Sequence, residues 1–551
     1  MGSSEDYTTD AKSVPPSPPS HNGHHDVQHG DVVDHGADSQ LQRKLSSRHV
    51  TMIALGSSIG MGLWLGSGTS LANGGPAALF IGYFLSGSMI WSVSQSIGEM
   101  AIMYPLPSAF VQWTNKFVDP AAGFSLGWCY WFQWWITIAN ELAGLVTVLG
   151  FWEGSKKVPT GGWIAIFLIV IVLINICAVN YFAESEVVFA AIKFGWIFVV
   201  IITMIVISAG GAPKGGAIGF RYWNETGGFT NGFKGFLAVM PTCIFAMSGS
   251  EACGLVAAET ENPKKSVPKA VNSIWVRLAL FYLVGSLMVT ITVSPYNEDL
   301  FGGSGTNASP FVIAYRDAGL EPLAHIMNFI IFISVLSTGS ISGYAGARTL
   351  VGLSEIHMAP KQMKRADKTG RPWWALVPTL VVGGGLAFLN VDATGATVFT
   401  WFSDLTSLIT LFGWGMICFS HIRMRHAWKV QGRSVNELPW KTWTFPIAAW
   451  WGLGWCLILV VAEFYLSVWP LDAPSSAETF FANFVSIPAG VIIWLAARLY
   501  YRLTEGSGWW VDSRTIDLDA GRRFYSDDIH GDIESAPVEK SKFGWARKLV
   551  E

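Results

Sequence analysis

The sequence has few charged residues. Only 14% of its 551 residues are Asp, Glu, Lys or Arg, whereas soluble domains carry about 25%. Hydrophobic residues make up 51% of the chain, and the mean hydropathy is +0.38. This composition excludes an ordinary soluble domain and indicates a membrane protein, with the lipid bilayer as its surroundings. The net charge of −3 is close to balance and points to no nucleic-acid partner.

Cysteines and motifs of known chemistry are also scarce. The six cysteines form no C-x-x-C pair and lie in or beside apolar runs, so we expect small core residues rather than disulfides. No Walker, Rossmann or metal-site pattern stands out, and no nucleophile–base pair appears. We therefore expect neither an enzyme nor a cofactor. No short apolar segment of the signal-peptide kind begins the chain, so the first span is expected to be its own insertion signal.

Long apolar runs are what the chain has instead. A helix of roughly 20 apolar residues spans a bilayer, and the sequence predicts an all-α membrane protein with twelve transmembrane helices. These candidate spans start near residues 50, 77, 123, 162, 186, 235, 274, 323, 374, 396, 443 and 481. Residues 1–48 are polar and predict a disordered cytoplasmic tail. Residues 49–502 form the predicted membrane domain, and residues 503–551 a second cytoplasmic tail.

Basic residues indicate the orientation. By the positive-inside rule, loops rich in Lys and Arg face the cytoplasm. Basic clusters fall on one side: Arg43, Lys44 and Arg48; Lys264, Lys265, Lys269 and Arg277; Lys361, Lys364, Arg365, Lys368 and Arg371; Arg423, Arg425, Lys429 and Arg433. This pattern predicts that both tails are cytoplasmic, although Lys156 and Lys157 fall on the other side. The two N-x-S/T sequons, at Asn224 and Asn307, fall in loops expected outside, where glycosylation occurs; Pro310 makes the second a poor acceptor.

Two apolar segments are interrupted by small residues at corresponding places, in residues 52–65 and 237–255. Each Gly costs a helix interior about 1 kcal/mol relative to Ala. Broken backbone is tolerated in lipid only where protein buries it or where it lines a cavity. Paired breaks in two repeats indicate a transporter binding site. We predict inverted repeats over about residues 50–209 and 235–424, with extra helices at about 443–502.

Short motifs spread along the chain support this interpretation. They lie at residues 56–62, 74–76, 98–101 with Pro105, 248–251, 259–270, Arg348 with 350–353, 359–361 and 420–423. In order and at family spacing, over roughly residues 45–505, they resemble the fungal amino acid permeases of the amino acid–polyamine–organocation superfamily. The resemblance implies a leucine-transporter-type fold with a 5+5 inverted repeat and two extra helices. It also implies a plasma-membrane protein that takes up L-amino acids by proton symport and alternating access.

The first break is predicted to bind the substrate carboxylate. It consists of six residues: Ser57, Ser58, Ile59, Gly60, Met61 and Gly62. Free amides at the start of a half-helix, with its positive dipole end, suit an α-carboxylate. The alternative is close glycine-mediated helix packing. Relatives often have Thr or Ser where Met61 stands, so the expected contact is with the backbone.

The second break is predicted to bind the α-ammonium through its carbonyl oxygens. The residues assigned to the substrate there are Phe245, Ala246, Ser248 and Gly249. Phe245 matches an aromatic residue that covers the substrate in related transporters. Glu251 follows this break and is a candidate proton carrier, because burial raises the pKa of a carboxyl group. The alternative for Glu251 is a cap or a bond to neighbouring backbone.

Two ionisable residues stand inside predicted spans. An acidic residue at a helix centre costs roughly 2.5–3.5 kcal/mol on insertion scales, so Glu141 must face the interior. The resemblance places it in the substrate cavity, where we expect it to contact substrate or carry the proton; a structural hydrogen bond is the alternative. Lys193 matches family members in which an ammonium replaces a coupling sodium ion, which predicts sodium-independent proton coupling. Snorkelling to an interface marked by Glu184 and Glu186 is its alternative.

The sequence says least about which substrate side chains the protein prefers. Asp404, in the tenth span, is a candidate contact for the substrate side chain. The expected partners are a small L-amino acid and a proton, with ubiquitin and trafficking machinery acting on the tails. Two alternatives remain open: a sensor of the same fold that binds without transport, and a carrier of polyamine, choline or γ-aminobutyrate.

Overall fold

The chain is mostly helical. The computed structural model describes residues 46–56, 59–177, 179–251, 254, 257, 260, 262–301, 308–391, 395–471, 474–505, 510–523 and 525. Within these ranges no strand forms, and one isolated β-bridge joins Leu300 to Ala308. Every helix belongs to one compact unit, Asp34–Phe524. The second unit, Met1–Val33 with Tyr525–Glu551, has Tyr525 as its sole described residue.

The first half of the helices carries the first break. They are α1 (Ser47–Gly56), α2 (Met61–Trp64), α3 (Gly66–Gly74), α4 (Pro76–Met103), α5 (Ala109–Phe117), α6 (Pro120–Leu149), α7 (Thr160–Asn175), α8 (Val179–Ser208) and α9 (Arg221–Glu225). The second half is α10 (Gly232–Met247), α12 (Pro263–Arg277), the π-helical turn Leu278–Val284, α13 (Gly285–Thr290), α14 (Pro310–Asp317), α15 (Glu321–Glu355), α16 (Trp373–Ala387), α17 (Gly395–Val430), α18 (Ile447–Val468), α19 (Ala477–Phe484) and α20 (Ser486–Glu505).

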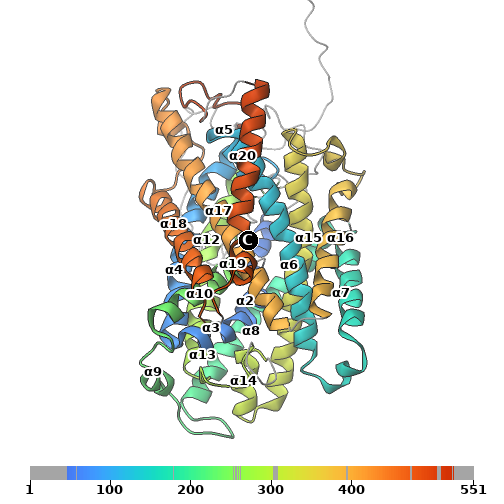
Figure 1. Cartoon of the computed structure of the whole chain (residues 1–551), viewed down its shortest axis with the longest axis vertical. Helices are drawn as coiled ribbons and strands as arrows, with labels where there is room; N and C mark the ends of the chain where they lie inside the picture. The colour runs from blue at the N-terminus through green and yellow to red at the C-terminus, as the bar shows by residue number, and fades with distance from the viewer. Residues whose placement is uncertain are drawn as a thin grey trace, which may run out of the picture. The chain divides into compact units, whose positions relative to one another are not determined.

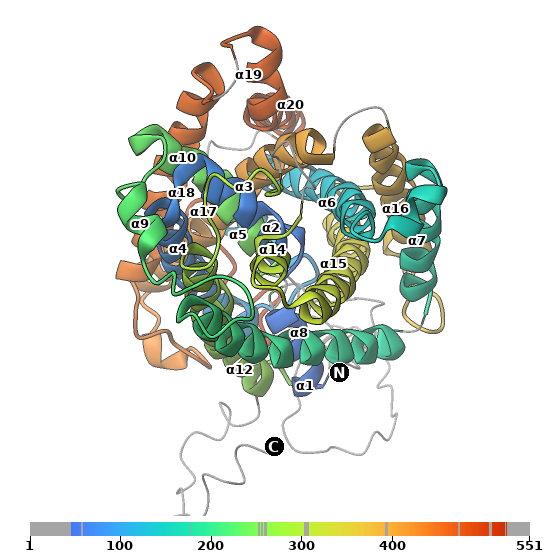
Figure 2. The same cartoon turned by 90° about the horizontal axis from the view of Figure 1, so that it is seen from below.

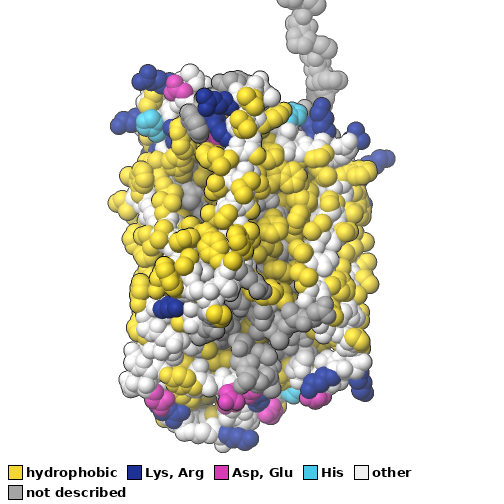
Figure 3. All heavy atoms as spheres, in the orientation of Figure 1, with side chains coloured by type: hydrophobic (Ala, Val, Ile, Leu, Met, Phe, Trp, Pro, Cys, Tyr) yellow, Lys and Arg dark blue, Asp and Glu magenta, His cyan; other side chains and the backbone are white. Residues whose placement is uncertain are grey.

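Seven helical segments of the described chain are long and apolar enough to cross a membrane, and α7 and α10 are shorter apolar helices. Each predicted span start falls within or next to a helix, but the count of twelve crossings and the inverted repeat remain predictions. Figure 3 shows a broad band of hydrophobic side chains between two ends that carry charged residues. Asn224 lies exposed on α9, as a glycosylation acceptor requires, whereas Asn307 lies outside the described residues.

Local sequence explains where the long helices begin. Gly75 has φ of +87°, which favours glycine, and Pro76 then occupies the first turn of α4, where its missing N–H is not needed. Asp119 caps α6 by accepting a hydrogen bond from the Ala122 amide at 3.1 Å, and Pro120 follows it. These two starts fix the helices that surround the broken segment.

The broken segment lies near the centre of the bundle. Figures 1 and 2 both place α2 between the long helices, and it contacts α6, α10 and α15. Small residues on α15 allow α6 to pack closely against it: a Cβ added to Gly339 would lie 3.5 Å from Glu141 Cβ, and one added to Gly346 would lie 3.0 Å from Trp134 Cβ. Close packing therefore brings side chains of α6 and α15 to the backbone of the first break.

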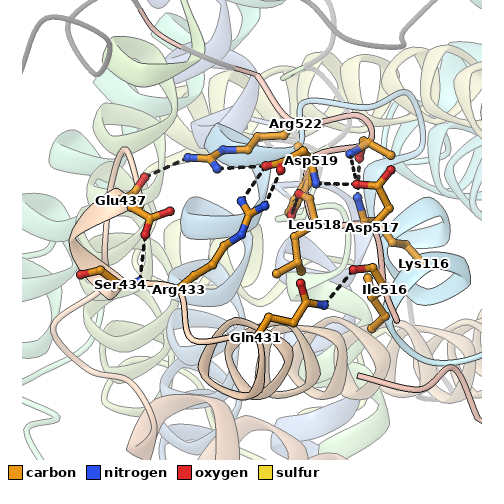
Figure 4. A network of polar contacts seen from close by, with 12 residues as sticks. Lys116, Gln431, Arg433, Ser434, Glu437, Ile516, Asp517, Leu518, Asp519 and Arg522 are labelled. Atoms are coloured by element: carbon orange, nitrogen blue, oxygen red, sulfur yellow. Dashed lines mark hydrogen bonds and ion pairs between the residues drawn. The ribbon is translucent and has the colours of Figure 1, made fainter. Parts of the chain in front are cut away.

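Residues 510–523 of the predicted C-terminal tail pack onto the ends of α4 and α5, where the Arg523 amide donates to the Met103 carbonyl at 2.9 Å and the Val511 amide to the Val118 carbonyl at 3.1 Å. Figure 4 shows Gln431, just after α17, bonded to the Ile516 carbonyl. Leu518 is buried, and its carbonyl accepts a 2.6 Å hydrogen bond from the hydroxyl of Tyr104. Arg433 forms an ion pair with Asp519, and this hydrogen-bonded partner lowers the pKa of the Asp519 carboxyl. Lys116 donates to the Ala520 carbonyl, and burial lowers the pKa of Lys116 to about 8. This part of the tail is a folded strap, which the sequence did not indicate.

We expect Leu518→Ala to release the strap without unfolding the membrane domain. Truncating a buried Leu costs about 2–5 kcal/mol, so amide hydrogen exchange of residues 510–523 should accelerate at least tenfold. Leu503→Ala, at an exposed position on α20, is the matched control and should leave exchange unchanged. Equal exchange rates in the two variants would show that Leu518 does not hold the strap.

Candidate functional site

The first break leaves backbone groups that α6, α8 and α15 satisfy. Helix α1 ends at Gly56, and α2 begins at Met61. Ser57 and Ser58 lie outside the described residues. The first four amides of a helix and the last four carbonyls have no partner within it. In a membrane interior each such group needs a partner from elsewhere in the protein.

Lys193 of α8 supplies donors to the carbonyl side of the break. Its ammonium donates 3.1 Å hydrogen bonds to the carbonyls of Gly56 and Ile59 and to the Ser337 hydroxyl. Ser337 in turn donates to the Glu186 carboxylate at 2.6 Å. Both charged side chains are buried. The Lys193 ammonium is bonded inside the bundle, which differs from the snorkelling alternative; Glu186 lies in the core beside it, whereas Glu184 is exposed.

The Ile59 carbonyl has two further donors, both from α15. Ser334 and Thr338 donate to it at 2.8 and 3.1 Å. Ser334 also accepts a 2.8 Å hydrogen bond from the indole of Trp64, at the end of α2. The run of small polar residues on α15 thus holds the open backbone and the start of the second half-helix together.

Glu141 of α6 occupies the amide side of the break. Its two carboxylate oxygens lie 3.3 and 3.2 Å from the Met61 amide, and the side chain is buried. Gly60 allows this approach, since a Cβ there would lie 2.7 Å from Glu141 Oε1 and 2.8 Å from Thr338 Oγ1. A carboxylate of the protein therefore stands where the sequence predicts the carboxylate of the substrate.

The second break faces the first. Helix α10 ends at Met247, and Gly249 has φ of +84°. A Cβ added to Gly62 would lie 2.7 Å from Ala246 Cα and 2.8 Å from the Phe245 ring. The carbonyls of Phe245 and Ala246 accept hydrogen bonds from Ser248 at 2.8 Å and Tyr282 at 2.7 Å. The Phe245 carbonyl also accepts from the Ser248 amide at 3.1 Å, which uses both of its lone pairs, whereas the Ala246 carbonyl keeps a second lone pair for a further donor.

A small cavity of about 10 Å³ lies between the two breaks. The predicted site residues that line it are Gly60, Gly62, Glu141, Phe245, Ala246, Ser248 and Gly249. Ile59 and Met61 take part through the backbone bonds described above. Four further lining residues were not predicted: Trp134, Thr137, Thr338 and Ser342. Two of these four residues could have been found from helical spacing. Trp134 and Thr137 lie seven and four residues before Glu141 and therefore share its face of α6.

Two predicted site residues lie elsewhere. Glu251 is buried outside this cavity, where its carboxylate accepts hydrogen bonds from the Gly249 amide at 3.2 Å, the Trp414 indole at 3.1 Å and the Tyr130 hydroxyl. These contacts correspond to the backbone-bond alternative for Glu251. Asp404 lines a different cavity, beside α18.

An all-helical membrane protein with two opposed helix breaks around a small polar cavity has the architecture of a carrier. Comparison with known proteins identifies the family. The model of the family described as amino acid permease matches residues 49–505. The chain therefore belongs to the amino acid permease family, which confirms the resemblance seen in its sequence motifs.

Curated relatives agree with the family. The chain is 39% identical to the general amino-acid permease GAP2 of Candida albicans over 88% of this chain and 82% of that protein. It is 37% identical to the general amino-acid permease GAP1 of Saccharomyces cerevisiae, over 88% and 81%. The S-adenosylmethionine permease GAP4 of Candida albicans is 36% identical, over 88% and 79%. These relatives are named as permeases and not as enzymes, in agreement with the prediction from the sequence.

We expect Gly60→Ala to abolish most transport. The new methyl group would overlap Glu141 and Thr338, and overpacking of this kind costs about 1–3 kcal/mol, or roughly tenfold to hundredfold in affinity. The matched control is Gly195→Ala on α8, where nothing lies within 4 Å of an added Cβ. Uptake by surface-expressed protein should fall only in Gly60→Ala. Equal uptake by both variants would show that the Gly60 approach is not part of the site.

Proposed function

We propose that this protein is a plasma-membrane secondary transporter that takes up L-amino acids by proton symport through alternating access. The observation that carries the proposal is the cavity between the two helix breaks, with the amide of one break and the carbonyls of the other on opposite sides. A zwitterion needs these two kinds of partner at once. The names of the relatives, two of them general amino-acid permeases, support the same substrate class.

The proposed coupling rests on competition for the Met61 amide. Glu141 accepts the hydrogen bond of this amide. An arriving α-carboxylate needs the same donor, and two carboxylates side by side repel each other. Protonation of Glu141 removes the repulsion and turns this residue into a hydrogen-bond donor. Substrate and proton therefore bind together, and neither occupies the site well alone.

Lys193 holds the other end of the break in this proposal. Its fixed ammonium takes the place of a coupling cation between Gly56, Ile59 and Ser337. Transport should then be indifferent to sodium. A proton entering a cell that is negative inside by 100 mV releases roughly 2.3 kcal/mol. This is enough to concentrate substrate roughly fortyfold, at about 1.4 kcal/mol per decade.

Alternating access follows from the paired breaks. Rocking of one group of helices around a fixed central site opens that site to each side in turn. The basic loops favour cytoplasmic tails, and the exposed position of Asn224 on α9 is compatible with an external loop. The plasma membrane is proposed from the family resemblance.

The substrate class is tested by competition. L-amino acids should inhibit uptake of a labelled neutral amino acid, whereas the same compounds amidated at the α-carboxyl should not, because they present no anion to the Met61 amide. Inhibition constants in cells that lack their own permeases give the answer. Equal inhibition by the amides would favour a polyamine or choline carrier. Saturable binding without uptake would favour a sensor.

A further inference from the structure

A second and larger cavity lies to one side of the central site. It is bordered by α3, α10, α17, α18 and α19, which Figure 2 shows grouped together. Its volume is about 720 Å³, and it reaches the surface, where its lining residues Trp401 and Phe481 are exposed. Two carboxylates line it, Asp404 of α17 and Glu463 of α18.

Within the described part of the chain, these two carboxyl groups have few hydrogen-bond partners. Glu463 is 96% buried, being 4% exposed. Its Oε1 accepts a 2.8 Å hydrogen bond from Ser407, and its Oε2 has no partner. Ser407 Oγ also lies 2.8 Å from the backbone carbonyl of Asp404, so the two acidic residues are close neighbours. The carboxylate of Asp404 has no hydrogen bond or ion pair with any described residue.

No basic side chain balances this pair. Among the described residues that line the cavity, none is Lys, Arg or His. Lys234 of α10 reaches the rim, but its ammonium donates to the Pro470 carbonyl at 2.9 Å. Charging a buried carboxyl group without a counter-ion costs several kcal/mol, and this cost favours the protonated form of the group. A cation that enters the cavity from outside the protein would remove this cost.

We propose that the Asp404–Glu463 cavity is a second binding site, specific for an organic cation with an ammonium or guanidinium group. Two carboxylates suit the several N–H donors of such a group. Phe402, Leu405 and Leu466 also line the cavity and provide apolar surface for an aliphatic chain. The ligand class is therefore a cationic head on a short hydrocarbon chain.

This second site borders the helix that carries the central site. Thr242 of α10 lines the second cavity, and Phe245, one turn further on, lines the first. The Phe245 ring packs edge-on against Phe399 of α17, with centroids 5.7 Å apart. A bound cation would join α17 and α18 to the face of α10 next to this ring. Occupancy of the second site is thus expected to alter how α10 moves.

The test uses agmatine, which is arginine without its carboxylate and therefore lacks the group that the central site requires. Binding is measured by titration calorimetry on the full-length protein in lipid nanodiscs. The wild type should bind agmatine at one saturable site. Asp404→Asn and Glu463→Gln should each weaken binding at least tenfold. Asp404→Asn removes no hydrogen bond of the fold, so its result stands even if Glu463→Gln fails to fold.

Two controls locate the site. Glu153→Gln, a change at an exposed carboxylate far along the chain, should leave agmatine affinity unchanged. Gly60→Ala, which adds a methyl group at the central cavity, should also leave agmatine affinity unchanged. The agmatine measurement therefore stays valid even if the proposed transport mechanism fails. Absence of saturable binding, or equal affinity in Asp404→Asn and the wild type, would overturn the proposal. Displacement of agmatine by an equal concentration of sodium would overturn the assignment to an organic cation.

Discussion

Backbone that is not in a helix has to be satisfied inside a membrane, and this constraint organises the protein. The first break exposes carbonyls at Gly56 and Ile59 and an amide at Met61. Lipid offers them no partner. The charged residues inside the bundle answer this need: Lys193 donates to the carbonyls, and Glu141 accepts from the amide. Burying either charged side chain alone costs free energy. The cost is offset because the backbone groups of the broken helix, carbonyls for Lys193 and an amide for Glu141, lie within hydrogen-bond distance.

The same arrangement leaves the site open to exchange. In the proposed mechanism, a substrate that carries both a carboxylate and an ammonium replaces protein groups at both breaks, whereas a compound with one charge replaces only one. Glu141 is then a competitor for the substrate rather than a passive wall of the cavity. In the proposed mechanism the proton settles this competition, and Lys193 keeps the carbonyl end in place while the amide end changes partner. The Asp404–Glu463 cavity adds two carboxyl groups on the other side of α10, with no basic residue among the described residues that line it.

Much of the central site was predictable because it breaks local rules. Glycines and single charged residues inside an apolar span cost free energy. This cost marked residues 56–62, Glu141 and Lys193 as candidates for the site. Residues that obey local rules gave no such signal, and helical spacing alone linked Trp134 and Thr137 to Glu141. Tertiary packing decided the rest. Glu186 was read as an interface residue, yet α15 covers it; Asp404 faces α18 because the rotation of α17 about its axis is set by its neighbours. The strap at residues 510–523 is held by single buried contacts such as Leu518, which no periodic pattern marks.

The central claim is that Glu141 carries the proton whose arrival allows substrate to bind. The most direct measurement compares accumulation of a labelled amino acid by the wild type and by Glu141→Gln, at acid and neutral external pH, with sodium replaced by choline. The account predicts acid-stimulated and sodium-indifferent accumulation by the wild type. In Glu141→Gln, exchange of substrate across the membrane should persist while concentrative uptake is lost, since a neutral side chain no longer needs a proton. Normal accumulation by Glu141→Gln, or a requirement for sodium in the wild type, would contradict the account.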